Sequence, residues 1–600
     1  MNMEAKMPEN KIKITPAKGR PMLHWIGKKP LDYVRGFPAQ LVEVFDPVNS
    51  GNIVETPTYE ELKDNWQNLL FHGDNKDVLA TLLELGFRGK IDLIYIDPPF
   101  KSGADYVRKV ELRGLKNLGN IEEDDASILQ QTMYFDIWNN DTYLQFMYER
   151  LLLMKELLSE TGSIYVHLDW HVGHYVKLLM DEVFGQDNFI NEIVWYYRRW
   201  NIAARLFARS HDCILFYVKS VGRHVFNHLY IPKSEKSSAQ GKAWKSVIGE
   251  NGVRRSILTG EPTKGVPMPD TWEISIVNPV GTERTEVGFQ TQKPEALLER
   301  IIKASSNPGD LVLDCFIGSG TTARVSQKLG RRWIGCDINK GAIHLTSREL
   351  QKIINEQVKK KETKYPIFAI YKVNNYDLQL LRTEAIELAV QHMGIQRTRT
   401  DRFFDGTLGK NLVKIIDFNH PLTLLDLQLL QDELKKRPDE DRDITVVCLG
   451  KELAIDPRVD EWNKKHPVNK IKVTELKTDK KYGSFLIHKP AEAKINIRRE
   501  NSKAIIEIQD FISPTIIERL NIDNKLFKVK IPDYRSMIDC VLIDNNYDDN
   551  TFHIVYSDVP EKKKDLVKGK YEIEIPEKKT KVAVKIIDML GEEVINVFEI

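Results

Sequence analysis

A tetrapeptide at the end of an apolar run carries groups that can activate an amine. The run IDLIYI is followed by Asp97, Pro98, Pro99 and Phe100. An amino group conjugated to an aromatic ring is a poor nucleophile because its lone pair is delocalised, so a site that uses it must accept both N–H protons. The Asp97 carboxylate and the Pro98 main-chain carbonyl are two such acceptors, held rigid by consecutive prolines. The Phe100 ring offers a flat face for stacking. Taken alone, Asp-Pro-Pro fits an ordinary turn equally well.

A second motif, LDCFIGSGTTA, joins an expected strand to an expected helix through a glycine-rich turn. Gly318 and Gly320 allow a ligand to approach the backbone, and the helix N-terminus presents unpaired amides. Asp337 ends the next expected strand, where its carboxylate can accept hydrogen bonds from a ribose. GSGTTA also satisfies the G-x-G-x-x-A pattern, so a nicotinamide-dependent oxidoreductase is a competing interpretation. Because no lysine follows the glycines, a P-loop is excluded.

A basic segment lies between the two motifs. Residues 198–264 hold 13 Lys/Arg and 4 Asp/Glu, a local net charge of +9, interleaved with aromatic residues. This mixture favours a polyanion-binding surface with stacking groups, and an ordinary solvated face is the alternative. The candidate phosphate-contacting side chains are Arg198, Arg199, Arg205, Arg209, Lys242, Lys245, Arg254 and Arg255.

Alternating strands and helices must position these motifs. From about residue 66 onward, short apolar runs alternate with stretches of helical periodicity, and a second unit of this kind spans about 290–345. This order predicts a parallel sheet covered by helices on both faces. Residues 411–476 indicate a small α/β unit, and short alternating runs from about 480 onward indicate a β-rich terminal domain. Residues 1–40 hold eight Lys/Arg and three Asp/Glu and are expected to form an extended basic arm.

The composition is that of an ordinary multidomain globular protein. Six hundred residues make room for three to five domains, and Lys+Arg 87 against Asp+Glu 86 leaves a net charge of +1, so a charge signal can only be local. No apolar run is long enough to span a bilayer, and the first residues lack the apolar core of a secretion signal. Five widely spaced cysteines without C-x-x-C favour a reducing compartment and argue against structural zinc.

In combination, the motifs resemble those of the S-adenosylmethionine-dependent amino-methyltransferases of DNA. FIGSGTT is similar to their cofactor loop and DPPF to their catalytic tetrapeptide. The tetrapeptide precedes the loop by more than two hundred residues, with the basic segment between them, an order similar to the β-group that includes type III modification subunits. FHGD, SIYVHLDWH, SHDCILFYVKS and TQKP match in register. The resemblance covers roughly residues 66–350.

The resemblance implies a role for each matching residue. Asp97 and the Pro98 carbonyl would accept the target amine, with Pro99 completing the tetrapeptide and Phe100 stacking on a base rotated out of the duplex. Asp rather than Ser at position 97 favours adenine-N6 over cytosine-N4, and Phe in place of the commoner Tyr at 100 keeps the stacking face. The implied cofactor contacts are Asp74, Lys293, Pro294, Asp314, Phe316, Gly318, Ser319, Gly320, Thr321 and Asp337.

A strand end rich in histidine, HLDWHVGHY, could be taken for a metal site. On a strand, His167, Asp169 and His171 would project to one side, as metal ligands do. Methyl transfer from a sulfonium needs no metal, however. We therefore expect a hydrogen-bonding cluster there and no metal ion.

The expected protein is a site-specific methyltransferase acting on adenine-N6 in double-stranded DNA, the modification component of a restriction-modification or related defence system. A cytosine-N4 methyltransferase and a catalytically silent DNA-binding or scaffolding subunit are the alternatives. The resemblance implies S-adenosyl-L-methionine as cofactor and a homodimer with a possible restriction or helicase-nuclease partner. A cytoplasmic, nucleoid-associated location is expected, with no membrane contact.

The expected fold class is α/β. A Rossmann-like doubly wound methyltransferase domain with circularly permuted motif order would carry an inserted DNA-recognition region, followed by a small α/β unit and a β-rich C-terminal domain. The predicted ranges are 1–65 for the basic arm, 66–219 for the catalytic half, 220–288 for the target-recognition insert, 289–360 for the cofactor half, 361–480 for the small α/β domain and 481–600 for the β-rich domain.

Overall fold

The computed structural model divides the chain into two compact units. The first holds Met1–Tyr106, Met133–Asn374 and Asp548–Val555, and the second holds Val107–Thr132, Asn375–Tyr547 and Tyr556–Ile600. The structure describes residues 11–600 apart from 18, 52, 101–104, 114–127, 136–139, 198–206, 232–241, 249–253, 263–264, 278–291, 375–385, 387–388, 391–392, 398–400, 402, 417–420, 453, 477–489, 518–530, 532 and 561–564. At 105–111, 128–135, 140, 242–248 and 254–262 it describes the backbone alone.

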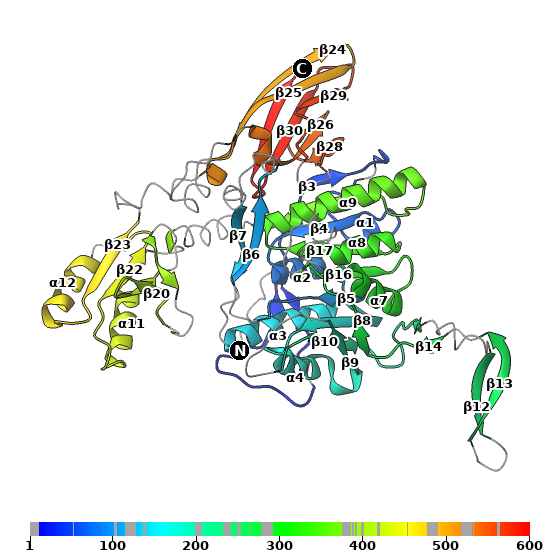
Figure 1. Ribbon diagram of the computed structural model, residues 1–600, viewed down its shortest axis with the longest axis horizontal. Helices are drawn as coiled ribbons and strands as arrows, with labels where there is room; N and C mark the ends of the chain where they lie inside the picture. The colour runs from blue at the N-terminus through cyan, green and yellow to red at the C-terminus, as the bar shows by residue number, and fades with distance from the viewer. Residues whose placement is uncertain are drawn as a thin grey trace, which may run out of the picture. The chain divides into compact units, whose positions relative to one another are not determined.

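An 11-stranded sheet forms the centre of the first unit (Figure 1). In spatial order its strands are β15 (Thr271–Glu273), β9 (Phe189–Tyr196), β10 (His211–Val218), β8 (Leu158–Leu168), β5 (Ile91–Ile96), β16 (Leu311–Asp314), β17 (Arg332–Asp337), β4 (Asn68–His72), β18 (Phe368–Val373), β3 (Ala39–Phe45) and β27 (Phe552–His553). The six strands from β8 to β18 are parallel. β10 runs antiparallel to both β8 and β9, and β3 antiparallel to β18.

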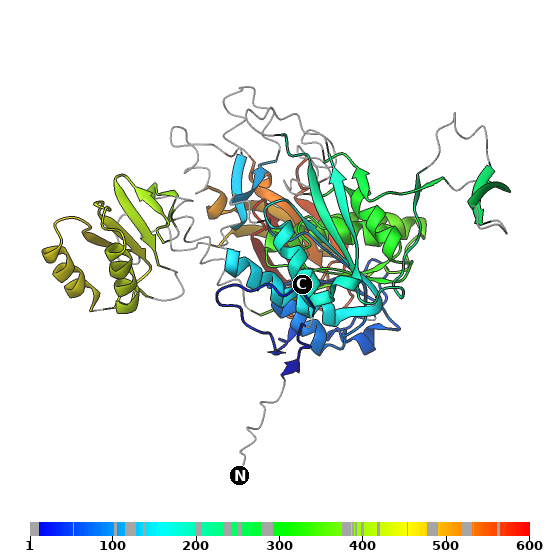
Figure 2. The ribbon, with the colours of Figure 1, turned by 90° about the horizontal axis from the view of Figure 1, so that it is seen from below.

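Helices cover both faces of this sheet. One apolar cluster joins α2 (Asn75–Glu84), α3 (Asn140–Leu157) and α4 (Gly173–Phe184) to side chains from one face, among them Ile94 and Leu313. A second cluster joins α7 (Glu295–Ser305) and α8 (Thr321–Lys328) to the other face through Leu93 and Val312. α9 (Lys340–Lys360) lies beside α8 in Figure 1, and Figure 2 shows helices on both sides of the sheet. Successive residues of β5 and β16 therefore enter opposite cores, which explains why both strands are apolar apart from Asp92 and the terminal Asp314.

The predicted α/β architecture is confirmed, with one correction and one addition. The sheet is mixed rather than purely parallel, because β10 pairs antiparallel with both β8 and β9, and β3 pairs antiparallel with β18. The apolar runs that predicted the sheet do not specify strand direction, so this could not be predicted from them. Within the segment expected to be an extended arm, β3 pairs with β18, Trp25 is buried, and Lys28 Nζ lies 2.6 Å from Glu182 Oε1. Apolar side chains such as Val44 anchor this segment to the sheet.

The remaining elements of the first unit are short. They are β1 (Ile12–Lys13), β2 (Tyr33–Val34), α1 (Tyr59–Leu62), the 3₁₀ turn η3 (Gln186–Asn188), β11 (Tyr230–Ile231), β12 (Lys242–Ile248), β13 (Arg254–Pro262) and β14 (Val266–Pro267). β12 and β13 form an antiparallel hairpin. Two further strands, β6 (Asp105–Glu111) and β7 (Ile128–Phe135), pair with each other and contain residues of both units.

The second unit contains three further sheets. One has the order β19 (Gln396–Arg397), β20 (Gly406–Leu408), β21 (Asn411–Ile415), β22 (Ile444–Cys448) and β23 (Ile471–Glu475), accompanied by α11 (Leu424–Lys435) and α12 (Ile455–Lys465). The others comprise β24 (Glu492–Glu500), β25 (Lys503–Ile512) and β29 (Lys570–Glu574), and β28 (Tyr556–Asp558), β26 (Ile538–Asp544), β30 (Lys581–Asp588) and β31 (Glu593–Glu599), with the 3₁₀ turn η5 (Tyr534–Met537). The six predicted domain ranges stay predictions.

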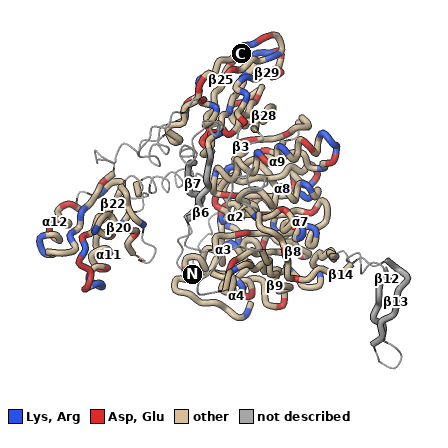
Figure 3. Tube along the Cα trace, viewed as in Figure 1, with Lys and Arg blue, Asp and Glu red and all other residues tan. Residues whose placement is uncertain are grey.

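Charge and hydropathy along the elements agree with a near-neutral globular chain. α11 carries three acidic residues and one lysine, and α12 carries three acidic and three basic residues (Figure 3). Among the described residues, no helix combines the length and apolar character needed to cross a bilayer.

Candidate active site

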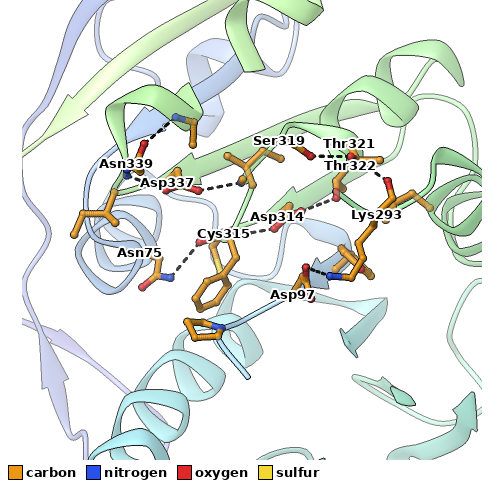
Figure 4. A pocket seen from close by; sticks show the side chains of 18 of the residues that line it. Asn75, Asp97, Lys293, Asp314, Cys315, Ser319, Thr321, Thr322, Asp337 and Asn339 are labelled. Carbon is orange, nitrogen blue, oxygen red and sulfur yellow. Dashed lines mark hydrogen bonds and ion pairs between the residues drawn. The ribbon is translucent and has the colours of Figure 1, made fainter. Parts of the chain in front are cut away.

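A cavity of about 320 Å³ lies where four parallel strands of the first unit end (Figure 4). Asp97 follows β5, Asp314 ends β16, Asp337 ends β17, and Asp74 follows β4 by two residues. Because these strands run parallel, their carboxyl ends share one edge of the sheet, where open α/β sheets place their ligands. The predicted site residues that line the cavity are Asp74, Asp97, Pro99, Lys293, Asp314, Phe316, Gly318, Ser319, Thr321 and Asp337.

The glycine-rich turn connects β16 to α8 as expected. Gly318 and Gly320 have φ angles of 51° and 77°, in the left-handed region that glycine tolerates. Gly320 is the N-cap of α8, and a Cβ atom there would lie 2.7 Å from the Thr346 hydroxyl oxygen. Thus both conformation and space require glycine at position 320.

Asp314 is buried at the start of this turn. Its carboxylate accepts hydrogen bonds from the Phe316 backbone N–H (2.9 Å) and the Thr322 hydroxyl (2.5 Å). Burial raises the pKa of the Asp314 carboxyl to about 7, with nearby Asp97 and Asp337 acting in the same direction. A positively charged ligand in the pocket would therefore stabilise the ionised form of the Asp314 carboxyl group.

Asp337 is fixed by the backbone on both sides. One oxygen accepts from the Gly318 N–H (2.9 Å) and the other from the Asn339 N–H (2.8 Å). Burial raises the pKa of this carboxyl to about 6. Among the described residues, neither Asp314 nor Asp337 forms an ion pair with a lysine or arginine.

Asp74, in contrast, pairs with an arginine that the sequence analysis did not single out. Arg150 Nη2 lies 3.0 Å from each oxygen of Asp74, Nε donates to Asn75 Oδ1, and the guanidinium carbon lies 3.6 Å from the Phe146 ring centre. Asn75 Nδ2 in turn donates to the Cys315 carbonyl (3.2 Å). The sequence did hold a signal for this pair: Arg150 lies in the apolar helical run FMYERLLLM, and a cation that is buried there needs an anionic partner.

Lys293 joins the tetrapeptide to the glycine-rich turn. Its ammonium forms an ion pair with Asp97 Oδ2 and lies 5.2 Å from the Phe100 ring centre, while its carbonyl accepts from the Thr321 hydroxyl (3.4 Å). Pro294 follows as the N-cap of α7. Four other predicted site residues do not line the cavity, but each is adjacent in sequence to a residue that does: Pro98, Phe100, Pro294 and Gly320.

A buried hydrogen-bonded chain leads away from the cavity wall, at the strand end where the sequence predicted hydrogen bonding without identifying the partners. Tyr95, which lines the cavity, bonds through its hydroxyl to His167 Nδ1 (2.9 Å); His167 Nε2 lies 3.2 Å from Asp212 Oδ2, and the Tyr197 hydroxyl donates to Asp212 Oδ1 (2.8 Å). His171 instead pairs with Asp169 (2.5 Å). Where side chains are described, no group of three or more His, Cys, Asp or Glu residues could hold a metal ion.

The predicted DNA-contacting residues are only partly described. Arg198, Arg199 and Arg205 lie outside the described residues, and Lys242, Lys245, Arg254 and Arg255 lie on β12 and β13, whose backbone alone is described. Arg209 is described, and its guanidinium carbon lies 3.7 Å from the ring centre of the half-exposed Trp170. The role of these residues stays a prediction.

Comparison with known proteins gives one family. The family model described as DNA methylase matches residues 91–348. Type II methyltransferase M1.MboII of Moraxella bovis is 34% identical over 213 residues, which cover 34% of this chain and 76% of the relative. Type II methyltransferase M.EcaI of Enterobacter cloacae is 30% identical over 324 residues, 45% of this chain and 66% of the relative.

The StyLTI Mod subunit of a type III restriction-modification enzyme from Salmonella typhimurium is 27% identical over 360 residues, covering 48% of this chain and 54% of the relative. The chain thus spans between about half and two thirds of the length of M.EcaI and the StyLTI Mod subunit.

The first prediction concerns Gly320. Replacing it with alanine combines left-handed strain with a clash against Thr346, so we expect Gly320→Ala to lower the free energy of unfolding by about 2–4 kcal/mol. Gly330 has a similar φ of 69°, but a Cβ added there would meet no heavy atom within 4 Å, so Gly330→Ala isolates the strain, worth about 1 kcal/mol. Urea denaturation compares the two variants, and equal losses would contradict the argument.

The second prediction concerns the buried carboxyl of Asp314. Between pH 4 and 7 the unfolded chain releases this proton while the folded protein retains it, so stability falls as pH rises and is constant above that window. Relative to Asp314→Asn, the wild-type free energy of unfolding should fall by about 3–4 kcal/mol from pH 4 to pH 8. Urea denaturation at several pH values measures this, with exposed Asp187→Asn as control. A difference independent of pH would show that Asp314 does not titrate as its burial predicts.

Proposed function

The chain belongs to the DNA methylase family, and from that premise we propose that it transfers the methyl group of S-adenosylmethionine to adenine-N6 in double-stranded DNA. The proposal rests on one observation: Asp97 and Pro99 line the same cavity as residues of the glycine-rich turn, namely Asp314, Gly318 and Thr321. An acceptor for the target amine and a cradle for the methyl donor would thus share one pocket. Holding two reactants close together in the correct orientation can remove a large part of the activation free energy of a transfer reaction.

The described residues fit S-adenosylmethionine. Bound there, the cofactor supplies a methyl group activated by a sulfonium. The buried carboxylates of Asp314 and Asp337 complement a cationic ligand, and the α8 N-terminus offers amides to a carboxylate. Apolar atoms for the adenine come from the cavity lining Phe146, Phe316, Ile317, Ile338 and Ala342.

The tetrapeptide would act on the target base. The Asp97 carboxylate and Pro98 carbonyl accept the two N–H groups of N6, which drives the nitrogen toward tetrahedral geometry and exposes its lone pair. Methyl transfer would form a carbon–nitrogen bond at N6 and break the carbon–sulfur bond of the donor, whose electron pair would stay on sulfur. N6 would then carry one proton too many, which would pass to water. Since the donor is already activated, no strong general base is needed.

The finer assignments belong to the same proposal. Asp at position 97 supports adenine-N6 over cytosine-N4, and the order of tetrapeptide, basic segment and glycine-rich turn supports a circularly permuted β-group enzyme. Similarity to the StyLTI Mod subunit supports a modification role in a restriction-modification system with a restriction partner. Homodimerisation is proposed from the sequence resemblance alone. The proposed location is cytoplasmic and nucleoid-associated, with residues 220–288 as the target-recognition insert.

The third prediction tests the chemical role of Asp97. We expect Asp97→Ala to keep cofactor and DNA binding and to lose methyl transfer by at least about 10²–10³-fold, because a preorganised acceptor is removed. Incorporation of labelled methyl groups into DNA measures the rate, and calorimetry measures binding. Single-molecule sequencing of a methylation-free host expressing the wild type reports base and motif. Retained activity in the variant would refute the role, and N4-methylcytosine would refute the adenine assignment.

The fourth prediction concerns the β12–β13 hairpin. If Arg254 and Arg255 contact phosphates, their charge reversal should weaken DNA binding and lower the slope of log affinity against log salt by about 2, near 0.9 per lost contact. Binding titrations at several salt concentrations measure this slope. Arg458→Glu on α12, which removes an exposed arginine paired with Glu461, is the control. An unchanged slope would show that the hairpin does not contact the DNA backbone.

A further inference from the structure

We propose that Lys293 is a positioning residue for Asp97, holding one carboxylate oxygen so that the other faces the target amine. The inference rests on the proposed methyl transfer and assigns the lysine side chain a role that differs from the cofactor contact implied by sequence resemblance. Lys293 Nζ pairs with Asp97 Oδ2, although 196 residues separate them. Only 12% of the Lys293 side chain and 20% of the Asp97 side chain are exposed.

The two oxygens of Asp97 have different surroundings. Oδ2 receives the ammonium, whereas Oδ1 is buried and has no hydrogen-bond partner among the described residues. A buried acceptor without a donor costs free energy, which an incoming N–H group recovers. Oδ1 is therefore the atom available to the target amine, and the ion pair decides that it is Oδ1 rather than Oδ2.

Lys293 is itself held in place from several directions. Its carbonyl accepts the Thr321 hydroxyl from the start of α8, and the next residue, Pro294, has a ring-restricted φ of −63° and caps α7. The ammonium lies 5.2 Å from the Phe100 ring centre, within the range of a cation–π contact. Figure 4 shows the Lys293 side chain extending toward Asp97. The lysine thus links the proposed catalytic tetrapeptide to the proposed cofactor turn.

The other carboxylates of the pocket have different partners. Asp74 is held by Arg150, while Asp314 and Asp337 accept hydroxyl or backbone N–H groups. Lys293 is accordingly matched to Asp97 within the described pocket. Without it, neither oxygen of Asp97 would have a described partner, and the carboxylate could rotate about its broad terminal torsion. Methyl transfer would then proceed with a poorly oriented Asp97 carboxylate, while the residues proposed to hold the cofactor would keep their contacts.

The fifth prediction separates positioning from cofactor binding. We expect Lys293→Met to lower kcat by about 10²-fold, the scale of one preorganised electrostatic contact, with cofactor and DNA dissociation constants changed less than about twofold. Lys293→Arg, which keeps charge and donors, should recover at least about tenfold of that loss. Lys303→Met, on exposed α7 surface beside Glu299, is the matched control and should match the wild type.

A double variant tests whether the lysine acts through Asp97. Both substitutions act on the same carboxylate, that of Asp97. The kcat of the Asp97→Asn, Lys293→Met double variant should therefore match that of Asp97→Asn alone within about twofold. Thermal melts check folding. If Lys293→Met is unfolded at the assay temperature, Lys293→Gln carries the same expectations.

Each contrary outcome is distinct. A tenfold weaker cofactor affinity with unchanged kcat would make Lys293 a cofactor contact, unchanged kinetics would remove its role, and multiplicative losses in the double variant would place its action elsewhere than Asp97. Any of these overturns the inference while leaving methyl transfer by the wild type intact. A wild type that binds S-adenosylmethionine but methylates no DNA would instead overturn the proposed function.

Discussion

The parallel pairing of β5 with β16 is the contact on which the site depends. Leu313 lies opposite Ile94 in this pair, so the residues that follow, Asp97 on one strand and Asp314 with its glycine-rich turn on the other, emerge at the same edge. The two motifs are more than two hundred residues apart in the chain. The sheet brings them to one cavity by placing the second strand beside the first. Both strands are buried on both faces, so a shift by one residue would exchange their side chains between the two cores and disturb the packing of each.

The described residues of the site carry more carboxyl groups than cations. Four carboxyl groups line a small cavity, and two described cations neutralise two of them. The raised pKa values of Asp314 and Asp337 express the cost of this arrangement, because burial penalises an ionised carboxylate that lacks a counter-ion. A cationic ligand would relieve that cost. The same groups whose ionisation costs free energy can therefore contribute affinity for a sulfonium cofactor, which links local instability to binding.

Sequence reasoning found the backbone-determined parts of the site and missed the side-chain pairings. The tetrapeptide and the glycine-rich turn carry local signals, since proline restricts φ and glycine permits positive φ, so their conformations could be read from residue type. The Lys293–Asp97 and Arg150–Asp74 pairs could not, because nothing in a linear sequence specifies which cation reaches which carboxylate across tens or hundreds of residues. For the same reason the Tyr95–His167–Asp212 chain was seen as a histidine-rich strand end without its partners.

The outer edge of the central sheet is built from distant parts of the chain. β3 comes from the N-terminal segment, and beyond it β27, residues Phe552–His553, pairs in parallel through Glu43 and Val44. A fragment cut after β18 would keep every residue of the cavity yet leave the backbone groups of β3 without this partner. Such a bare edge invites pairing with another copy. The first unit is thus not a contiguous module that can be excised or grafted, and swapping C-terminal regions between relatives would have to preserve this short closing strand.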